Sequence, residues 1–376
     1  MRETIEKLKG SVLFNLSLSS KELFHSNFLY WIGQNYPKEF GALFVDYLNK
    51  KPSDSKIINI SREKENIDLS FKYSNNQEIL IENKVKSVPY LSQLSKYSKK
   101  HTPDRNYILL SLSEPLFFNS EKTIVIDNVT WHFLSYSELR NRLQTIVTKI
   151  DIDYHKNIIS DYLTFIDGLV EANQLCQIKE DDLFDFHSLE ANPIYKSLMD
   201  IRLHDFYLKK KYEFLAYEVY KRVTKLSDNV NGFSQPLKWD SNPSLIYTAF
   251  GMTNAQGLMD IKYVISKNVA LGIQIQGPHY RMFIEDSNGK IAHKNKEELG
   301  KELWFNFDRS FPNERIYPKT EKGFNKYGET FFYKSAKLGI HRKVSDVLDI
   351  VLADFNHIHN NLKRFQEIFD FNEGLN

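Results

Sequence analysis

Two carboxylates and one amine occupy positions from which they could act together. Asp68 lies in the stretch IDLSFKY, and Glu82 and Lys84 end the stretch EILIENK fourteen residues later. Carboxylate oxygens suit Mg²⁺, which is held by one or two carboxylates and keeps several waters. Such a cation polarises a phosphodiester, and a neighbouring lysine can orient or help to deprotonate the attacking water. These residue types therefore predict metal-assisted hydrolysis of a phosphodiester.

Two neighbouring strands must position these groups. Residues 67–73 alternate apolar and polar side chains, and residues 78–84 form a second strand candidate. Glu82 and Lys84 are two residues apart and so share a face of the strand. Asp68 joins that face in an antiparallel pair only if the connecting loop holds an odd number of residues. We expect a loop of three, Asn75 to Gln77.

The motif and its surroundings resemble the PD-(D/E)xK nuclease superfamily. Asp68 followed by ENK at 82–84 is similar to the D…(D/E)xK core of that superfamily. The next segment carries QLSKY at 93–97, similar to the QLxxY motif of the RecB-like branch. Its first and last residues lie one helical turn apart and therefore on one face. The chain departs from the motif at Ile67, where the family name has proline, and the resemblance covers about the first 150 residues.

The resemblance implies both a fold and a set of roles. The fold class is α/β, a restriction-endonuclease-like α/β/α core with a central mixed sheet, followed by an α+β accessory domain. Mg²⁺ or Mn²⁺ would be held by Asp68, Glu82 and the backbone carbonyl of Asn83. The catalytic set that the resemblance implies is Asp68, Glu82, Lys84, Gln93 and Tyr97, with Lys84 positioning the attacking water and the last two steadying the site or the phosphate.

A further metal ligand is suggested in the first predicted helix, within residues 11–36. Two interpretations of Glu22 stay open. Ser19 and Glu22 have the spacing of a capping box, which explains the glutamate without catalysis. Many superfamily members also place a glutamate of this helix near the metal. His25 is expected on the same outer edge as Glu22, as a structural hydrogen bonder, and the buried stripe is expected to be Phe24, Phe28, Trp31 and Ile32.

The remaining elements of the core follow from periodicity. We expect helices at 37–50, 137–148 and 156–174, and strands at 56–63, at 107–113 and at either 123–127 or 130–135. A basic cluster near the end of the QLxxY helix has two interpretations, phosphate binding or complementing the helix dipole. It consists of Lys96, Lys99, Lys100, His101 and Arg105.

An acidic segment at 179–182 marks a boundary between residues 1–178, the nuclease-like domain, and residues 179–376, the accessory domain. In the second part we expect helices at 194–226, 296–308 and 343–369 and an antiparallel meander at 244–286. Asp260, Gln274 and Gln276 repeat the spacing of the first motif, but two glutamines cannot replace a carboxylate ligand and an ammonium. The accessory domain is therefore expected to recognise a target or a protein partner.

Composition narrows the class of protein. The 376 residues include 50 basic and 48 acidic side chains, so nucleic-acid binding must come from local patches. The single cysteine, Cys176, permits no internal disulfide and suits a reducing cytoplasm. No run approaches the roughly 18 apolar residues that span a bilayer, so no membrane partner is expected.

The sequence thus predicts a metal-dependent nuclease. We expect an endodeoxyribonuclease that acts in prokaryotic or phage genome defence or in DNA processing, as the resemblance implies. One alternative is a non-catalytic member of the fold that binds nucleic acid or protein, although intact Asp68, Glu82 and Lys84 argue against it. Another is a nuclease acting on RNA with the same chemistry. Duplex cleavage by one active site per chain would favour a homodimer.

Overall fold

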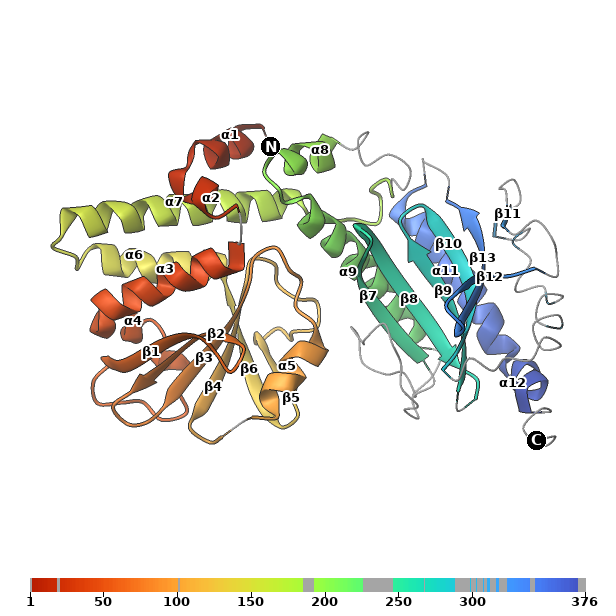
Figure 1. Cartoon of the computed structure of the whole chain (residues 1–376), viewed down its shortest axis with the longest axis horizontal. Helices are drawn as coiled ribbons and strands as arrows, with labels where there is room; N and C mark the ends of the chain where they lie inside the picture. Colours follow the sequence, from red (N-terminus) through yellow and green to blue (C-terminus); the bar gives the residue numbers. More distant parts are fainter. Residues whose placement is uncertain are drawn as a thin grey trace. The chain divides into compact units, whose positions relative to one another are not determined.

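The computed structural model describes residues 2–18, 21–100, 102–184, 193–225, 246–266, 268–287, 298, 302, 307, 310–311, 316–317, 323–338 and 342–370. The chain divides into two compact units (Figure 1). The first contains Met1–Gln177 and Pro193–Tyr207, and the second contains Ile178–Asn192 and Leu208–Asn376. Among the described residues, no helix is long and apolar enough to cross a membrane.

A mixed sheet forms the centre of the first unit, as predicted. Its strand order is β1-β2-β3-β4-β6-β5. Strands β1, β2 and β3 pair antiparallel, β3 pairs parallel with β4 and β4 with β6, and β5 and β6 form an antiparallel hairpin. The sequence predicted one strand, at either 123–127 or 130–135, and the structure has a strand in each of these segments. The bounds are β1 Ile57–Lys64, β2 Ile67–Tyr73, β3 Glu78–Lys84, β4 Arg105–Ser111, β5 Thr123–Ile126 and β6 Val129–Ser135.

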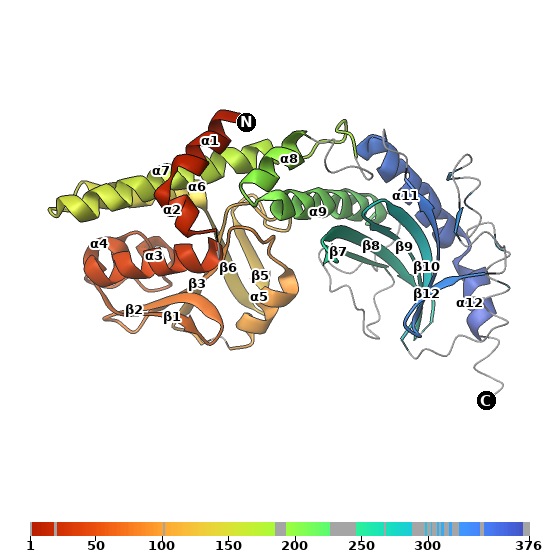
Figure 2. The same ribbon diagram turned by 45° about the horizontal axis from the view of Figure 1, so that its top comes forward.

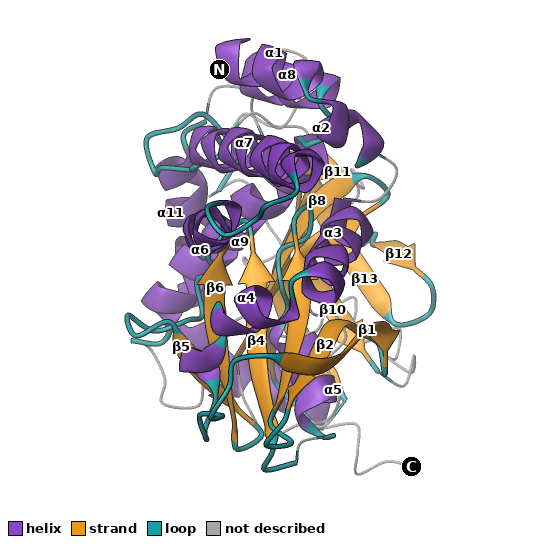
Figure 3. Cartoon of the chain, turned by 90° about the vertical axis from the view of Figure 1, so that its left-hand side faces the viewer, coloured by secondary structure: helices purple, strands orange, loops and turns teal. Residues whose placement is uncertain are grey.

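Helices cover both faces of this sheet. Helices α3 (Lys21–Asn35) and α4 (Pro37–Ala42) pack on one face, against β1 and its neighbours (Figure 2). Helix α5 (Leu91–Ser98) packs on the other, where Leu94 joins Leu80 and Trp131 in a buried cluster. Helices α6 (Tyr136–Val147) and α7 (Asp153–Leu175) pack on each other (Figure 3). The other helical segments are α1 Arg2–Gly10, α2 Val12–Leu16, the 3₁₀ turn Val45–Tyr47 and α8 Pro193–Asp200.

The buried face of α3 differs from the predicted stripe. His25, Ser26, Leu29, Ile32 and Gly33 are buried, whereas Phe24, Phe28 and Trp31 are only half-buried. Helix α7 packs beside α3, where its Tyr162 stacks on Phe28 at 4.0 Å between ring centres and its Phe165 stacks on His25 at 5.1 Å. His25 lies inside the protein and not on an outer edge with Glu22, so that part of the prediction was wrong. Helix α1 was not predicted, and α2 was not distinguished from the first helix.

The hairpin between β2 and β3 has the predicted odd loop, shifted by one residue. The N–H of Tyr73 donates to the carbonyl of Gln77 at 2.9 Å, so the loop is 74–76 and not 75–77. Asn76 has φ of 65°, the left-handed conformation that asparagine tolerates. The three-residue length sets the strand register on which the site depends.

The second unit contains an antiparallel sheet with the strand order β11-β13-β10-β9-β8-β7, and β12 pairs with β13. Helix α11 (Val344–Asn360) packs on one face, where Tyr280 donates to Asp354 at 2.6 Å. The predicted meander is present, and β13 adds a strand that the sequence did not suggest. The bounds are α9 His204–Val223, β7 Ile246–Thr253, β8 Gln256–Val264, β9 Val269–Gln276, β10 His279–Asp286, β11 Ile316–Tyr317, β12 Asn325–Tyr327, β13 Phe331–Lys337 and α12 Leu362–Asp370.

Two predicted long helices are each divided. Arg202, with φ of 54°, separates α8 from α9, because a left-handed residue cannot continue a right-handed helix. Asn361 ends α11: its N–H still donates to the carbonyl of His357, but its φ of −112° is not helical. Helix α12 begins at the next residue. The predicted helix at 296–308 falls largely outside the described residues.

Candidate active site

Strands β2 and β3 bring Asp68 and Glu82 together where their ladder ends. The register pairs Leu69 with Ile81, and the next step places Asp68 opposite Glu82. At this point the N–H of Asn83 donates to Asp68 Oδ2 at 2.7 Å. The carboxylate of Asp68 thus takes a place that a strand carbonyl would occupy in a continuing ladder. Its position is fixed by the backbone of the motif itself.

The carboxylate of Glu82 has one saturated oxygen and one without a partner. The residue is only 2 % exposed. Its Oε1 forms an ion pair with Lys84 Nζ at 2.6 Å and accepts a hydrogen bond from Gln93 Nε2 at 2.7 Å. Its Oε2 is buried and has no hydrogen-bond partner within the described part of the chain. A buried carboxylate oxygen without a donor is costly, and its presence needs an explanation.

The three charged groups perturb one another. Burial raises the pKa of Glu82 to about 7, and the nearby charge of Asp68 adds to the effect. Burial also raises the pKa of Asp68. Burial alone would lower the pKa of Lys84, but the carboxylate of Glu82 outweighs it and raises that pKa above its usual value. Lys84 is therefore a cation at neutral pH, and Glu82 is poised between its two protonation states.

Helix α5 supports Glu82 through the residues of the QLxxY pattern. Gln93 Nε2 donates both to Glu82 and to the hydroxyl of Tyr97, the second bond being 3.2 Å long. Leu94 is fully buried against the sheet and so anchors the helix. The helical spacing of these residues gives the amide and the phenol a common direction toward the strand motif.

Glu22 holds the turn that follows β3. Its Oε1 accepts hydrogen bonds from the N–H groups of Val85, Lys86 and Ser87, at 3.3, 2.9 and 3.2 Å, and from the Ser87 hydroxyl at 3.0 Å. Burial alone would raise the pKa of Glu22, but these donors lower it. Its charge reaches the site, since it also raises the pKa of Asp68. Ser19, the partner in the predicted capping box, lies outside the described residues.

Asn83 has a role that sequence reasoning missed, because only its backbone carbonyl was considered. Its Nδ2 donates to the carbonyl of Glu22 at 2.9 Å and to Ser26 Oγ at 3.1 Å, and its Oδ1 accepts from the Tyr136 hydroxyl at 2.6 Å. The middle residue of the motif therefore locks β3 to α3. The signal was available, because a buried asparagine between buried neighbours must find partners. Its N–H faces β2, so its carbonyl faces the same side, near Asp68.

Two more buried polar residues lie in α3. His25 Nδ1 is hydrogen-bonded to the Tyr162 hydroxyl at 2.7 Å, and burial lowers the pKa of His25 to about 3. It is therefore neutral and structural. Lys21 lies 4.1 Å from the ring centre of Phe14, and its buried Nζ has no hydrogen-bond partner among the described residues. Burial lowers the pKa of Lys21 to about 7, a feature with no signal in the sequence.

The basic cluster at the end of α5 is divided between two environments. Arg105 pairs with Glu78 at 3.2 Å and with Glu65 at 3.3 Å, so its charge is already matched. Lys96, Lys99 and Lys100 are exposed, and His101 lies outside the described residues. Arg105 thus has a structural role at the start of β4, and of the described members of the cluster only the lysines offer charge to a ligand.

The donor set fits a divalent cation. Among the described residues, no three histidine, cysteine or acidic side chains gather closely enough to hold a metal ion by themselves. Mg²⁺ needs fewer, because one or two carboxylates and several waters complete its shell. The unpartnered oxygen of Glu82 and the adjacent carboxylate of Asp68 meet that requirement. A cation there would also remove the cost of burying an ionised Glu82.

The comparisons with known proteins bear on this part of the chain. Residues 12–164 match the family model described as the PD-(D/E)XK nuclease superfamily. No curated protein and no solved structure matches the chain. The matched segment contains the whole hairpin with Asp68, Glu82 and Lys84, together with helices α3 and α5. Over this segment the chain is thus similar to the PD-(D/E)XK nuclease superfamily, as its motifs predicted.

Proposed function

We propose that the protein is a metal-dependent nuclease that hydrolyses phosphodiester bonds at Asp68, Glu82 and Lys84. The proposal rests mainly on one observation. Among the described residues, Glu82 buries a carboxylate oxygen that has no hydrogen-bond partner, beside a second carboxylate and a lysine whose pKa is raised. A purely structural hairpin would gain stability by replacing the buried pair of Glu82 and Lys84 with apolar residues, since a buried ion pair is often less stable than such a replacement. A site for a cation explains why the group is kept.

Mg²⁺ or Mn²⁺ would be held by Asp68, by Glu82 and by the backbone carbonyl of Asn83. When bound, the cation supplies positive charge that polarises the phosphodiester and lowers the pKa of water. We propose Glu22 as a further ligand only through its second oxygen, because Oε1 already accepts four hydrogen bonds from the turn after β3.

The side chains of the protein then have separate roles. Lys84 is protonated at neutral pH, so it serves as a donor that orients the attacking water or stabilises negative charge on the phosphate, and not as a base. Gln93 holds Glu82 Oε1 and thereby directs the free oxygen of that carboxylate. Tyr97 holds Gln93 in turn and offers its hydroxyl to the phosphate.

We further propose DNA as the substrate and genome defence or DNA processing as the setting. The support is the likeness of the QLSKY segment to the RecB-like branch and the nuclease description of the matching family. RNA is the competing substrate, because the same residues would cut it. The single cysteine, Cys176, is buried and has no second cysteine in the chain with which to form a disulfide, as suits a reducing cytoplasm. A homodimer is part of this proposal only for duplex cleavage, which needs two active sites.

The test is a cleavage assay with labelled duplex DNA, single-stranded DNA and RNA. Each substrate is incubated with Mg²⁺, with Mn²⁺ and with a chelator. We expect cutting with either metal and none with the chelator. Lys84→Ala should lower the cleavage rate by about 10²- to 10⁴-fold, the usual contribution of one positioned catalytic group. It should leave metal binding in place, whereas Asp68→Ala should weaken metal binding itself.

Lys149→Ala is the matched control, because Lys149 is an exposed lysine just after α6 and lies outside the basic cluster. It should cut at nearly the wild-type rate. If Lys84→Ala cuts as fast as wild-type protein, the activity comes from elsewhere and the mechanism is wrong. If no substrate is cut under any condition, the non-catalytic alternative replaces this proposal.

A further inference from the structure

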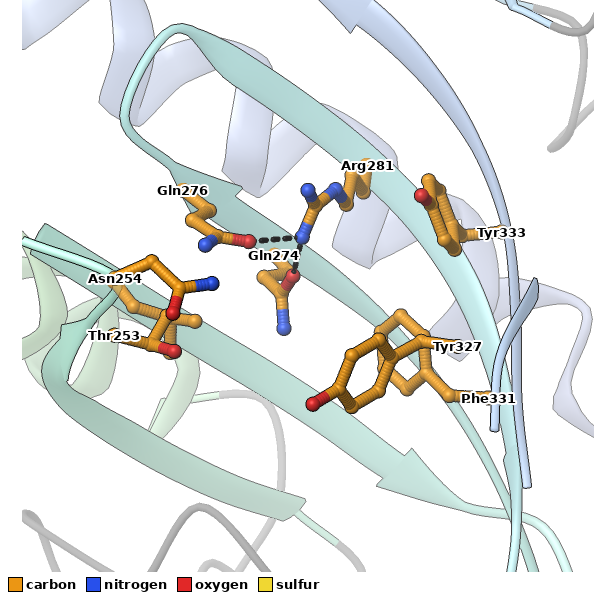
Figure 4. A pocket seen from close by; sticks show the side chains of 9 residues that line it. Thr253, Asn254, Gln274, Gln276, Arg281, Tyr327, Phe331 and Tyr333 are labelled. Atoms are coloured by element: carbon orange, nitrogen blue, oxygen red, sulfur yellow. Dashed lines mark hydrogen bonds between the residues drawn. The ribbon is translucent and has the colours of Figure 1, made fainter. Parts of the chain in front are cut away.

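A cavity of about 280 Å³ lies in the second unit, among the ends of several strands (Figure 4). Thr253 and Asn254 border it at the turn between β7 and β8, where Asn254 and Ala255 both have positive φ. Gln276 borders it beside the tight turn between β9 and β10. Apart from Asn254, the lining residues belong to strands β7, β8, β9, β10, β12 and β13. The sheet therefore holds the lining in place, which favours a preformed site.

The polar side of this cavity is organised by one arginine. Arg281 Nη1 donates to Gln274 Oε1 and to Gln276 Oε1, and its guanidinium lies 4.8 Å from the ring centre of Tyr333. A guanidinium has donors only, so both glutamines must turn their carbonyl oxygens toward it. Their amide nitrogens must then point elsewhere. In the described part of the chain, Gln276 Nε2 donates to no other group.

The other side of the cavity is aromatic. Figure 4 shows the rings of Tyr327 and Phe331 opposite Thr253 and Asn254, with the two glutamines between them. Phe331 is fixed by stacking on Phe283, with 4.6 Å between the ring centres. Tyr327 is 80 % exposed, an unusual state for so large a ring. The cavity thus offers a rigid ring and an exposed ring on one side and hydrogen-bond donors on the other.

We propose that this cavity binds one unstacked nucleobase of the nucleic acid. Unstacked bases are held by aromatic rings on their faces and by amide or guanidinium groups on their edges, which is the combination present here. A cavity of this size suits a single ring system. The inference rests on the proposed function, since it assigns the second unit to recognition of the same substrate.

The hydrogen-bonding groups also select among bases. The amide of Gln276 and the hydroxyl of Thr253 can donate, and Arg281 adds positive charge. The base should therefore present acceptors. Guanine carries two adjacent acceptors, O6 and N7, whereas adenine pairs its N7 with a donor. Guanine is accordingly the base that we assign to the cavity.

Binding can be measured without cleavage. The full-length protein is titrated, with a chelator present, into labelled oligoadenylate strands that carry guanine, adenine or an abasic position at the centre, and anisotropy is recorded. Guanine should bind most tightly. Tyr327→Ala should weaken that binding by about 5- to 100-fold, the effect of losing one base–aromatic stack. Gln276→Leu should remove the preference for guanine over adenine.

Tyr154→Ala is the matched control, because Tyr154 is 69 % exposed on α7 in the first unit. It should bind guanine strands like wild-type protein. Competition by guanosine monophosphate as effective as that by the strand would mean that the cavity takes a free nucleotide, and the strand assignment would fall. Equal competition by inorganic phosphate would reduce the cavity to an anion site and would overturn the inference.

The outcomes separate this inference from the nuclease proposal. If wild-type protein cuts nucleic acid but Tyr327→Ala binds guanine strands normally, the inference about the cavity is wrong and the nuclease proposal is unaffected. If no substrate is cut but guanine binding depends on Tyr327, the nuclease proposal falls and the base site stands. Lys84→Ala should lower the cleavage rate by about 10²- to 10⁴-fold and keep the preference for guanine over adenine in the anisotropy titration, because the two measurements report on different sites.

Discussion

Cation binding at the candidate site should depend strongly on pH near neutrality. The cause is Glu82, whose pKa burial and Asp68 raise to about 7. A cation must displace the proton that this carboxyl holds below its pKa. Such a group is about one tenth ionised at pH 6 and about nine tenths ionised at pH 8. The apparent affinity for the cation should therefore rise about tenfold between these two values.

The raised pKa of Glu82 also makes the free energy of unfolding depend on pH. The pKa of Glu82 rises from 4.5 to about 7 on folding, so the folded protein without metal holds the proton more tightly than the unfolded chain does. This contribution to the free energy of unfolding is complete below about pH 4.5 and is lost as the pH rises through about 7. The total loss is about 3 kcal/mol, since one unit of pKa corresponds to about 1.4 kcal/mol. A bound cation favours the ionised form and should offset the loss at high pH.

The assay is thermal unfolding with and without Mg²⁺ at about pH 6 and about pH 8. The stabilisation by Mg²⁺ should be clearly larger at the higher pH. Without Mg²⁺, Asp68→Asn should move the pH-dependent loss of stability to lower pH, because it removes the negative charge next to Glu82. Asp260→Asn is the control, since Asp260 is another buried carboxyl, whose pKa burial raises to about 6, in the second unit. Equal stabilisation at both pH values, or full stabilisation in Glu82→Gln, would refute the reasoning.

Three other changes test how the site is supported. Gln93→Leu removes a donor to Glu82, so the pKa of Glu82 should rise further and the rising limb of the pH–cleavage profile should move to higher pH; an unchanged profile would contradict the role of the amide. Tyr136→Phe leaves Asn83 Oδ1 buried without its donor, which should lower the free energy of unfolding by about 1–3 kcal/mol in a denaturant titration. Gly41→Ala would place Cβ 1.9 Å from a backbone carbonyl oxygen, so it should destabilise the fold by about 1–3 kcal/mol or more, and wild-type stability would show that α4 can move aside.

The hairpin and its chemistry could be predicted because strand geometry is strict. A period of two fixes the face of Glu82 and Lys84, and an odd loop brings Asp68 opposite them, whatever surrounds the strands. The loop was displaced by one residue, which changes the residue opposite Asp68 from Lys84 to Glu82. Its odd length was right, and the odd length alone places Asp68 on the same face as Glu82 and Lys84. The spacing of Gln93 and Tyr97 was equally informative, because a helix face is a local property.

The partners of Asn83 could not be predicted in this way. Its side chain meets Ser26 and Tyr136, which lie 57 and 53 residues away along the chain. Which helix covers which face of the sheet is decided by packing between distant segments. The buried face of α3 was mistaken for the same reason, since Tyr162 and Phe165 of α7 lie against His25, which the local pattern places on the outer edge. The groups around Arg281 likewise come from separate strands and show no periodic signal.

The connection between β3 and β4 implies an order of folding. Strands β2 and β3 are joined by a loop of three residues, so Asp68 and Glu82 can meet within microseconds of hairpin formation. Strand β4 is parallel to β3 and pairs with it only after the crossover through α5 has closed. Glu82 is therefore beside another carboxylate before Gln93 can reach it. Changes in the turn at 74–76 should then act mainly on the folding rate, and changes in α5 mainly on the rate of unfolding.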